Sequence, residues 1–288
     1  MAKSYFKLIS AMLIWGSIAL FVRSIPFSSA EIVSCRIILG AVFLIALWFI
    51  QGRRLDKEAL RRNGLRLIIS GVIMGLNWVT LFESYIYVDV TIATLGYYCA
   101  PIFVIIGSIL IFKQKPQPRR LISVAFAVLG MVIVTGVNMG GSDPVRGLTF
   151  ALISAVFYSI VTLFNKTFDG LDGLDCTICQ ILTAGVVVIP YALISHSGPW
   201  VMPNTAGIVS IIVLGFVHTG AALYFYFSAI KELPSETVAL CSYIDPVSAI
   251  IFASIFLNEQ LTPMQIAGAA LIIGSALWSE ISGKKKKA

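Results

Sequence analysis

Long apolar stretches separated by short polar connections dominate the chain. Ten of them are long enough to form membrane-crossing helices, because about 20 apolar residues span the hydrocarbon core of a bilayer as a helix. They lie at residues 5–22, 30–50, 66–86, 90–112, 120–137, 147–165, 176–194, 206–229, 236–257 and 264–281. No connection is long enough to hold a soluble domain, so the pattern predicts an all-α membrane protein with ten transmembrane helices.

The composition agrees with this pattern. Hydrophobic residues make up 58% of the 288 residues and charged residues only 12%, about half of the charged share in soluble domains. The mean hydropathy is +0.92. So little polar surface excludes an ordinary soluble enzyme, a disordered chain and a nucleic-acid-binding domain.

The lysine and arginine residues gather on one side of the predicted membrane. Of the 21, 18 lie on the side of the two termini, Arg23 and Arg146 lie on the other side, and Arg36 lies within a span. Cationic loops are retained in the cytoplasm. We therefore expect a multi-pass protein of the cell (inner) membrane with both termini in the cytoplasm, and its net charge of +7 needs no nucleic-acid partner.

The two halves of the chain repeat each other at a nearly constant offset. Leu8-Ile9-Ser10-Ala11 recurs 144 residues later as Leu152-Ile153-Ser154-Ala155. Four further positions recur at an offset of 145, pairing Leu95, Tyr98, Pro101 and Pro118 with Leu240, Tyr243, Pro246 and Pro263. The sequence thus predicts two five-helix halves, residues 1–138 and 145–288. An odd number of spans inserts the second half in the opposite sense, as in many secondary transporters.

The first span also has the features of a signal peptide, since Lys3 and Lys7 accompany an apolar run. Its counterpart in the second half favours retention. Cys176-Thr177-Ile178-Cys179 has the spacing of a redox or metal motif, but no second pair or ligating histidine accompanies it. We therefore expect no metal and no cofactor.

The last predicted connection and span carry a recognisable pattern. Phe256-Leu257-Asn258-Glu259-Gln260-Leu261-Thr262-Pro263 is followed by a Gly- and Ala-rich run from Gln265 to Gly274. Together with Arg36 in the second span and the prolines of the fourth and ninth, this resembles the EamA-type ten-helix members of the drug/metabolite transporter superfamily. The first half departs from the pattern, because Gln114 stands where the second half has Glu259.

The resemblance implies gradient- or proton-driven movement of small metabolites, often export. It also implies a central cavity lined by spans 1, 3, 4, 6, 8 and 9. It does not name the solute.

Three ionisable residues within spans are candidates for coupling or gating. Asp245 lies in the ninth span directly before Pro246, and a carboxylate beside a helix distortion suits a proton or cation site, or a structural carboxylate held by neighbouring donors. Glu83 and Arg36 are expected at similar depth. They could pair, and such a pair could act as an outer gate, with Glu31 and Asp89 as competing partners for Arg36. Pro101 and Pro246 are the expected helix kinks.

Aromatic and amide residues gather near the middle of spans, whereas interfacial aromatic belts lie at span ends. The candidates for substrate binding are Trp15, Asn77, Trp78, Tyr97, Tyr98, Tyr158, His218 and Tyr243, and Tyr224 and Tyr226 lie in the same region. A cavity lined by such groups suits an amphipathic solute such as an amino acid. For each residue alone, helix packing or a structural hydrogen bond is the alternative.

These features favour a non-enzymatic secondary transporter, most simply an exporter of amino acids or related compounds with proton coupling. No phosphate-binding loop of the G-x-x-x-x-G-K-[ST] type is present, which argues against ATP-driven pumping. Three alternatives remain: an uncoupled facilitator, a membrane-embedded enzyme acting on lipid-linked substrates, and a structural or sensory membrane protein. The expected partners are a small-molecule solute and the lipid bilayer, and a homodimer stays open.

Overall fold

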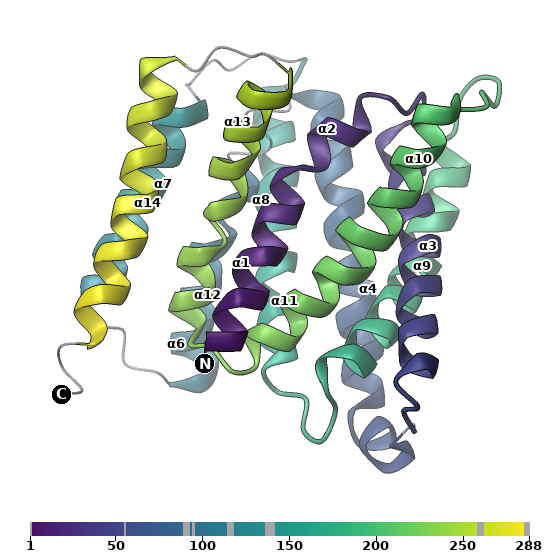
Figure 1. The fold of residues 1–288 in the computed structure, drawn as a ribbon, viewed down its shortest axis with the longest axis horizontal. Coiled ribbons are helices and arrows are strands. Elements are labelled where there is room, and N and C mark those ends of the chain that lie inside the picture. The colour runs from purple at the N-terminus through teal and green to yellow at the C-terminus, as the bar shows by residue number, and fades with distance from the viewer. Residues whose placement is uncertain are drawn as a thin grey trace.

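The chain folds into an array of helices (Figure 1). The computed structural model describes residues 2–54, 56–88, 93, 96–113, 118–135, 142–257 and 262–284, and every regular element in these ranges is helical. Seven helical stretches are long and apolar enough to cross a membrane, and shorter apolar helices lie at Ala100–Phe112, Leu121–Ile133 and Ile266–Ser275. The molecule is thus an all-helical, multi-pass membrane protein.

The first half of the chain contributes α1 (Ala2–Gly16), α2 (Ile18–Val22), α3 (Ser29–Ile50), α4 (Lys57–Tyr87), α6 (Ala100–Phe112) and α7 (Pro118–Thr135). The second half contributes α8 (Pro144–Asn165), α9 (Gly173–Ser195), α10 (Thr205–Val213), η1 (Leu214–Ala221), α11 (Ala222–Ile230), α12 (Ser235–Cys241), α13 (Ile244–Leu257) and α14 (Pro263–Lys284). The segment η1 is a π-helix, and it continues directly from α10 into α11.

Polar side chains begin several of these helices. Ser28 accepts a hydrogen bond from the backbone N–H of Glu31, whose carboxylate accepts one from the N–H of Ser28, so α3 begins with a capping box. The side chains that cap α4, α8, α9 and α10 are Asp56, Asp143, Asp172 and Asn204. Caps of this kind satisfy N–H groups that have no partner within the helix.

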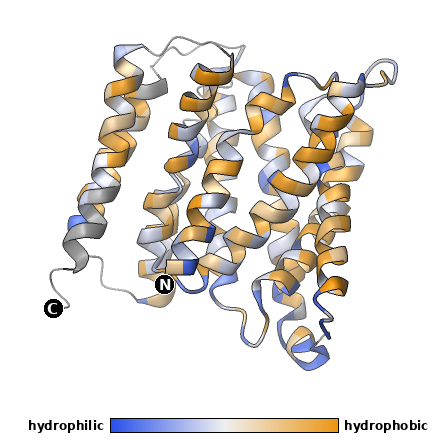
Figure 2. Ribbon diagram, viewed as in Figure 1, coloured by the Kyte–Doolittle hydropathy of each residue, from blue (hydrophilic) through white to orange (hydrophobic). Residues whose placement is uncertain are grey.

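The N-terminus and the C-terminal end of α14 lie at the same edge of the array (Figure 1). We call this side the terminal face and the other side the opposite face. The helices α8 and α9 both pack against α4, α3 packs against α9 and η1, and α1 packs against α11 and α13. The helices are mostly apolar along their length, and hydrophilic positions gather at the start of α4 on the terminal face (Figure 2).

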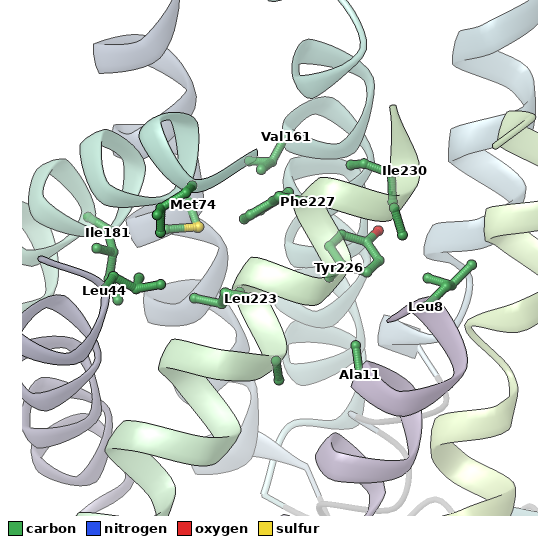
Figure 3. Packing of buried hydrophobic residues seen from close by; sticks show 14 of the residues in the cluster. Leu8, Ala11, Leu44, Met74, Val161, Ile181, Leu223, Tyr226, Phe227 and Ile230 are labelled. Atoms are coloured by element: carbon green, nitrogen blue, oxygen red, sulfur yellow. The ribbon is translucent and has the colours of Figure 1, made fainter. Parts of the chain in front are cut away.

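The core lies where α1, α3, α4, α8, α9 and α11 meet. Leu8, Leu44, Met74, Ile181 and Ile230 are all buried there. Leu8 and Ile230 lie beside Tyr226 at one end of this core, and Leu44, Met74 and Ile181 lie together at the other end (Figure 3). The pair α7 and α14 lies to one side and touches the other helices through α12 and α13. Contacts among the central helices therefore position the site described next.

Some of the predicted spans are interrupted. The first span breaks at Ser17, whose Oγ donates to the carbonyl of Ile14 (2.7 Å), and Gly-Ser pairs are a common cause of helix kinks. The ninth span breaks at Ser242 and Tyr243, and α6 begins after a turn at Tyr98 and Cys99.

Pro101 and Pro246 lie in the first turn of α6 and of α13. The missing backbone N–H has no intrahelical partner at such a position. Each proline therefore follows an interruption and does not kink the middle of a continuous helix, in contrast to the kinks predicted from the sequence. Asp89, Gln114 and Glu259 lie outside the described residues.

Candidate functional site

A central cavity of about 570 Å³ lies between the helices, within the range of about 300–1,000 Å³ that is common for small-molecule sites. Its lining comes from α1 to α4, from α6, α8, η1, α11 and α13, and from the turns that precede α6 and α13. The two exposed lining residues are Ala19 and Ser29, which lie near the opposite face in α2 and α3. The lining residues nearest the terminal face, among them Met12, Thr162 and Phe227, are buried. The lining is therefore exposed only near the opposite face, and its end near the terminal face is buried.

One wall of the cavity is a chain of aromatic rings. Trp15 lies 5.2 Å from Tyr226, Tyr226 lies 6.2 Å from Tyr158, and Tyr158 lies 5.8 Å from Tyr97, all between ring centroids. Tyr97 in turn lies 6.1 Å from Tyr98. Tilted and edge-on pairs of this kind add about 0.5–1.5 kcal/mol beyond burial. The rings thus give the cavity a continuous aromatic surface from four separate parts of the sequence.

Asp245 lies at the end of this aromatic chain. It is in the first turn of α13, lines the cavity, and accepts a hydrogen bond from the hydroxyl of Tyr98 (3.1 Å). A carboxylate in this position also complements the positive end of the helix dipole. A charged residue at the centre of a membrane helix costs about 2.5–3.5 kcal/mol on insertion scales. Asp245 therefore has both a structural partner and access to a space that a solute or a proton could enter.

Arg36 lines the cavity from α3, and its Nε donates to the Oγ1 of Thr219 (3.0 Å). It lies seven residues after the start of α3, which places it about 10 Å along the helix at 1.5 Å per residue. Thr219 belongs to the π-helix η1 and donates to the carbonyl of Leu214 (3.0 Å). Short π-helical segments inside α-helices are frequent at functional sites.

His218, the neighbour of Thr219 in η1, also lines the cavity. One ring nitrogen, Nε2, lies 2.9 Å from the hydroxyl of Ser17, and the other, Nδ1, lies 3.3 Å from the carbonyl of Val213. The backbone carbonyl of His218 accepts from the indole N–H of Trp15 (2.9 Å). These contacts fasten the interruption in the first span to the π-helix.

Asn77 and Trp78 line the cavity from α4. The amide of Asn77 donates to both the carbonyl and the hydroxyl of Ser154, at 2.7 and 2.8 Å. The hydroxyl of Ser154 donates back to the carbonyl of Asn77 (2.8 Å). The side chain of Asn77 therefore joins α4 to α8. The neighbouring Trp78 is only partly buried and lines the cavity.

Hydrogen bonds seal the end of the cavity near the terminal face. The hydroxyl of Tyr226 lies 2.5 Å from that of Tyr158 and 3.1 Å from that of Thr162. Beyond this hydroxyl cluster, Lys166 at the end of α8 donates to the carbonyls of Ile230 (2.8 Å) and Leu233 (2.5 Å) at the end of α11. Ser4 also donates to Glu232, which joins α1 to the same region. The seal thus consists of specific polar contacts within a buried apolar core.

Three of the predicted site residues lie elsewhere. Glu83 accepts a hydrogen bond from Tyr191 in α9 and does not line the cavity. Tyr243 is fully buried against α7 and α14 and donates to the carbonyl of Tyr98 (3.2 Å). Pro246 is buried outside the cavity lining. The break before α13 accounts for the position of Tyr243, because it turns Ser242 and Asp245 toward the cavity and Tyr243 away from it.

The predicted pair between Glu83 and Arg36 is wrong. Among the described residues no carboxylate lies within ion-pairing distance of Arg36, because each nearby acid has another partner. Glu83 is held by Tyr191, and Glu31 lies 2.5 Å from Nδ1 of His196.

Several lining residues were not anticipated. Thr162 and Thr219 carry no signal in the sequence, because threonine is common in membrane helices and both act through partners from other helices. Tyr85 and Phe82 line the cavity near the opposite face. Phe82 follows Trp78 by four residues and Tyr85 follows Leu81 by four, and this spacing could have placed them on the same side of α4.

Comparisons with known proteins agree with this architecture. The model of the EamA-like transporter family matches residues 2–136 and again residues 145–280. The chain is 26% identical to the uncharacterized transporter YxxF of Bacillus subtilis over 277 residues, which cover 94% of this chain and 88% of that protein. It is 24% identical to the uncharacterized transporter YoaV of the same organism, over the full length of both.

A solved crystal structure of a protein also has the same fold. It matches 96% of this chain and 98% of its own chain with a TM-score of 0.85 and 17% sequence identity. At this identity the likeness concerns the fold alone. The two family matches together cover most of the sequence, and we conclude that the chain belongs to the EamA-like transporter family.

Proposed function

We propose that this chain is a secondary transporter that moves small organic metabolites by alternating access, as an exporter of amino acids or related amphipathic compounds. The observation that carries the proposal is the central cavity, which is open toward one face, sealed toward the other, and lined by aromatic rings and a few polar groups. A membrane-embedded enzyme would need a cluster of reacting groups near one membrane face. The lining of the cavity offers isolated acidic and basic groups instead.

We further propose ten membrane crossings in two inverted halves, residues 1–138 and 145–288, with both termini in the cytoplasm. The two family matches support the division. The turns at Tyr98–Cys99 and Ser242–Tyr243 support it as well, because each contains a tyrosine three residues before a proline, Tyr98 before Pro101 and Tyr243 before Pro246. Labelling of a Lys3→Cys variant by a membrane-impermeant thiol reagent, in a background without the native cysteines, tests the orientation. Labelling from outside the cell would contradict it.

Asp245 is the proposed coupling residue. Protonation would remove the charge of a carboxylate that faces the cavity and is held by Tyr98, and this change would accompany the closing of the cavity toward the opposite face. The coupled mechanism thus differs from an uncoupled facilitator in one measurable respect, which is the response of accumulation to a proton gradient.

The experiment uses purified protein in proteoliposomes. A thermal-stabilisation screen against amino acids, polyamines and nucleosides first identifies a transported solute. Asp245→Asn should abolish accumulation driven by a pH gradient and preserve exchange of solute across the membrane. Asp169→Asn, at an exposed position in the connection between α8 and α9, is the matched control.

Unchanged gradient-driven accumulation in the Asp245→Asn variant would remove the coupling role. Wild-type protein that exchanges solute but ignores the pH gradient would favour the uncoupled facilitator. Wild-type protein that exchanges none of the solutes that stabilise it would contradict transport itself.

A further inference from the structure

Arg36 presents an unused hydrogen-bonding surface to the cavity. A guanidinium has five N–H donors, and only Nε is engaged, by Thr219. No residue in the described ranges accepts a hydrogen bond from the two Nη atoms. The two Nη atoms are not fully buried. Since Arg36 lines the cavity, they are reachable from it.

The surroundings hold this guanidinium in a fixed orientation. Thr219 is itself held by its bond to the carbonyl of Leu214. The π-helix comes close enough to α3 for this contact because position 40 is glycine, where an added Cβ would lie 2.7 Å from the Cγ2 of Thr219. An arginine fixed through Nε directs its other four N–H groups as a planar fork. Such a fork matches the two oxygens of a carboxylate.

The other residues that line the cavity indicate the chemistry of the rest of the ligand. Val33, Trp78, Phe82 and Leu223 come from helices around the cavity and offer apolar or aromatic surface. The carboxylate of Asp245 is held at Tyr98, in the turn before α6. A ligand with one anionic group and an apolar body would therefore satisfy the guanidinium and bury its body against the aromatic residues.

We propose that the cavity recognises organic carboxylates with an apolar body, and that Arg36, oriented by Thr219, binds the carboxylate in a bidentate manner. The inference rests on the proposed function only in taking this cavity as the solute site. It gives Arg36 a role in recognising the solute, in place of the gating pair with Glu83 that the sequence suggested.

Four compounds of similar shape separate the possible charges of the ligand. They are 3-phenylpropanoate, 3-phenylpropanamide, 3-phenylpropanol and 3-phenylpropylamine, and their binding to purified protein is followed by tryptophan fluorescence, since Trp15 and Trp78 line the cavity. The carboxylate should bind at least tenfold more tightly than each of the other three. Equal or tighter binding of the amide, alcohol or amine would overturn the proposal, as would failure of the wild-type protein to bind the carboxylate.

Variants then assign the contact to Arg36. Arg36→Gln should weaken binding of 3-phenylpropanoate at least tenfold and leave binding of the alcohol within twofold. Arg54→Gln, at an exposed position beyond the end of α3, should change neither. Wild-type affinity for the carboxylate in Arg36→Gln would overturn the assignment.

Two milder variants cover the case in which Arg36→Gln fails to fold. Arg36→Lys keeps the charge and loses the fork, and Thr219→Val removes the acceptor that orients it, so each should weaken carboxylate binding about three- to tenfold. Wild-type affinity in both would overturn the proposal. If the alcohol or the amine is exchanged in proteoliposomes while the carboxylate is not, this inference fails and the transport function stands. If the carboxylate binds and no compound is exchanged, this inference stands and the proposed transport function fails.

Discussion

The two ends of the central cavity differ in how they are built. Near the terminal face, the hydroxyl cluster of Tyr158, Thr162 and Tyr226 and the Lys166 contacts close the space within a buried apolar core. Near the opposite face, the lining reaches the exposed residues Ala19 and Ser29. The polar contacts at that end, between Glu31 and His196 and between Glu83 and Tyr191, fasten α3 and α4 to the end of α9 and its cap and leave the cavity uncovered.

Under the proposed alternating access, this difference identifies the contacts that must change during transport. Opening toward the terminal face requires the ends of α8 and α11 to separate, which breaks the contacts of Lys166 and Tyr226. The contacts at the opposite end do not cross the cavity, so they can persist. Variants at the sealed end should therefore alter stability and access strongly, and variants at the open end only weakly.

The largest effect is expected at Lys166. Lys166→Met removes two hydrogen bonds from a charged donor to the carbonyls of Ile230 and Leu233, each worth about 1.5–3 kcal/mol. We expect the free energy of unfolding to fall by about 3 kcal/mol or more. Unfolding of purified protein in denaturing detergent measures this, with Lys57→Met at an exposed position in the first turn of α4 as control. Equal stability of the two variants would show that the seal does not depend on Lys166.

A smaller effect is expected at Tyr226. Tyr226→Phe keeps the ring and removes the hydroxyl that contacts Tyr158 and Thr162, a loss of about 1–3 kcal/mol for two bonds. This should raise the population open to the terminal face about tenfold or more, since 1.4 kcal/mol is a factor of ten. Tyr224→Phe is the matched control, because Tyr224 lies under Lys7 and does not line the cavity.

The readout for both tyrosine variants is the labelling rate of a Val161→Cys substitution by an impermeant thiol reagent added at the terminal face. Val161 is a buried lining residue near the seal. Labelling that Tyr226→Phe leaves unchanged would show that the hydroxyl cluster does not close this end.

The smallest effect is expected at Glu31. Glu31→Gln weakens its contact with His196 near the opposite face, where ion pairs near the surface contribute about 0–1 kcal/mol. We expect a loss of unfolding free energy below about 1 kcal/mol and no change in Val161→Cys labelling. A loss as large as that of Lys166→Met would show that the open end is as strongly fastened as the sealed end.

Much of the architecture follows from the sequence, because span positions depend on local hydropathy. The predicted stretch 30–50 corresponds closely to Ser29–Ile50, and 147–165 to Pro144–Asn165. The break at Ser17 could have been found from the Gly16-Ser17 pair. The π-helical register of η1 could not, because it depends on packing against α3.

Site residues could be predicted where the residue type and its position within a span were sufficient, without knowledge of the residues that it contacts. Trp15, Trp78, Tyr158 and Asp245 stood out as aromatic or charged groups in mid-span, and all four line the cavity. The partners of Glu83 and Arg36 come from helices more than 100 residues away in the chain. Such pairs are set by tertiary packing, which local sequence patterns do not report.

Access to the cavity from each face tests alternating access without knowledge of the solute's chemistry. In a cysteine-free background in sealed vesicles of known orientation, Ala19→Cys and Val161→Cys are labelled separately with an impermeant reagent added at either face. We predict that Ala19→Cys reacts only from the opposite face. Val161→Cys should react from the terminal face only while a transported solute is exchanging. The labelling rate of Ala19→Cys from the opposite face should fall under the same conditions. Constant labelling of both positions with and without exchange, or reaction of Ala19→Cys from the terminal face, would contradict alternating access.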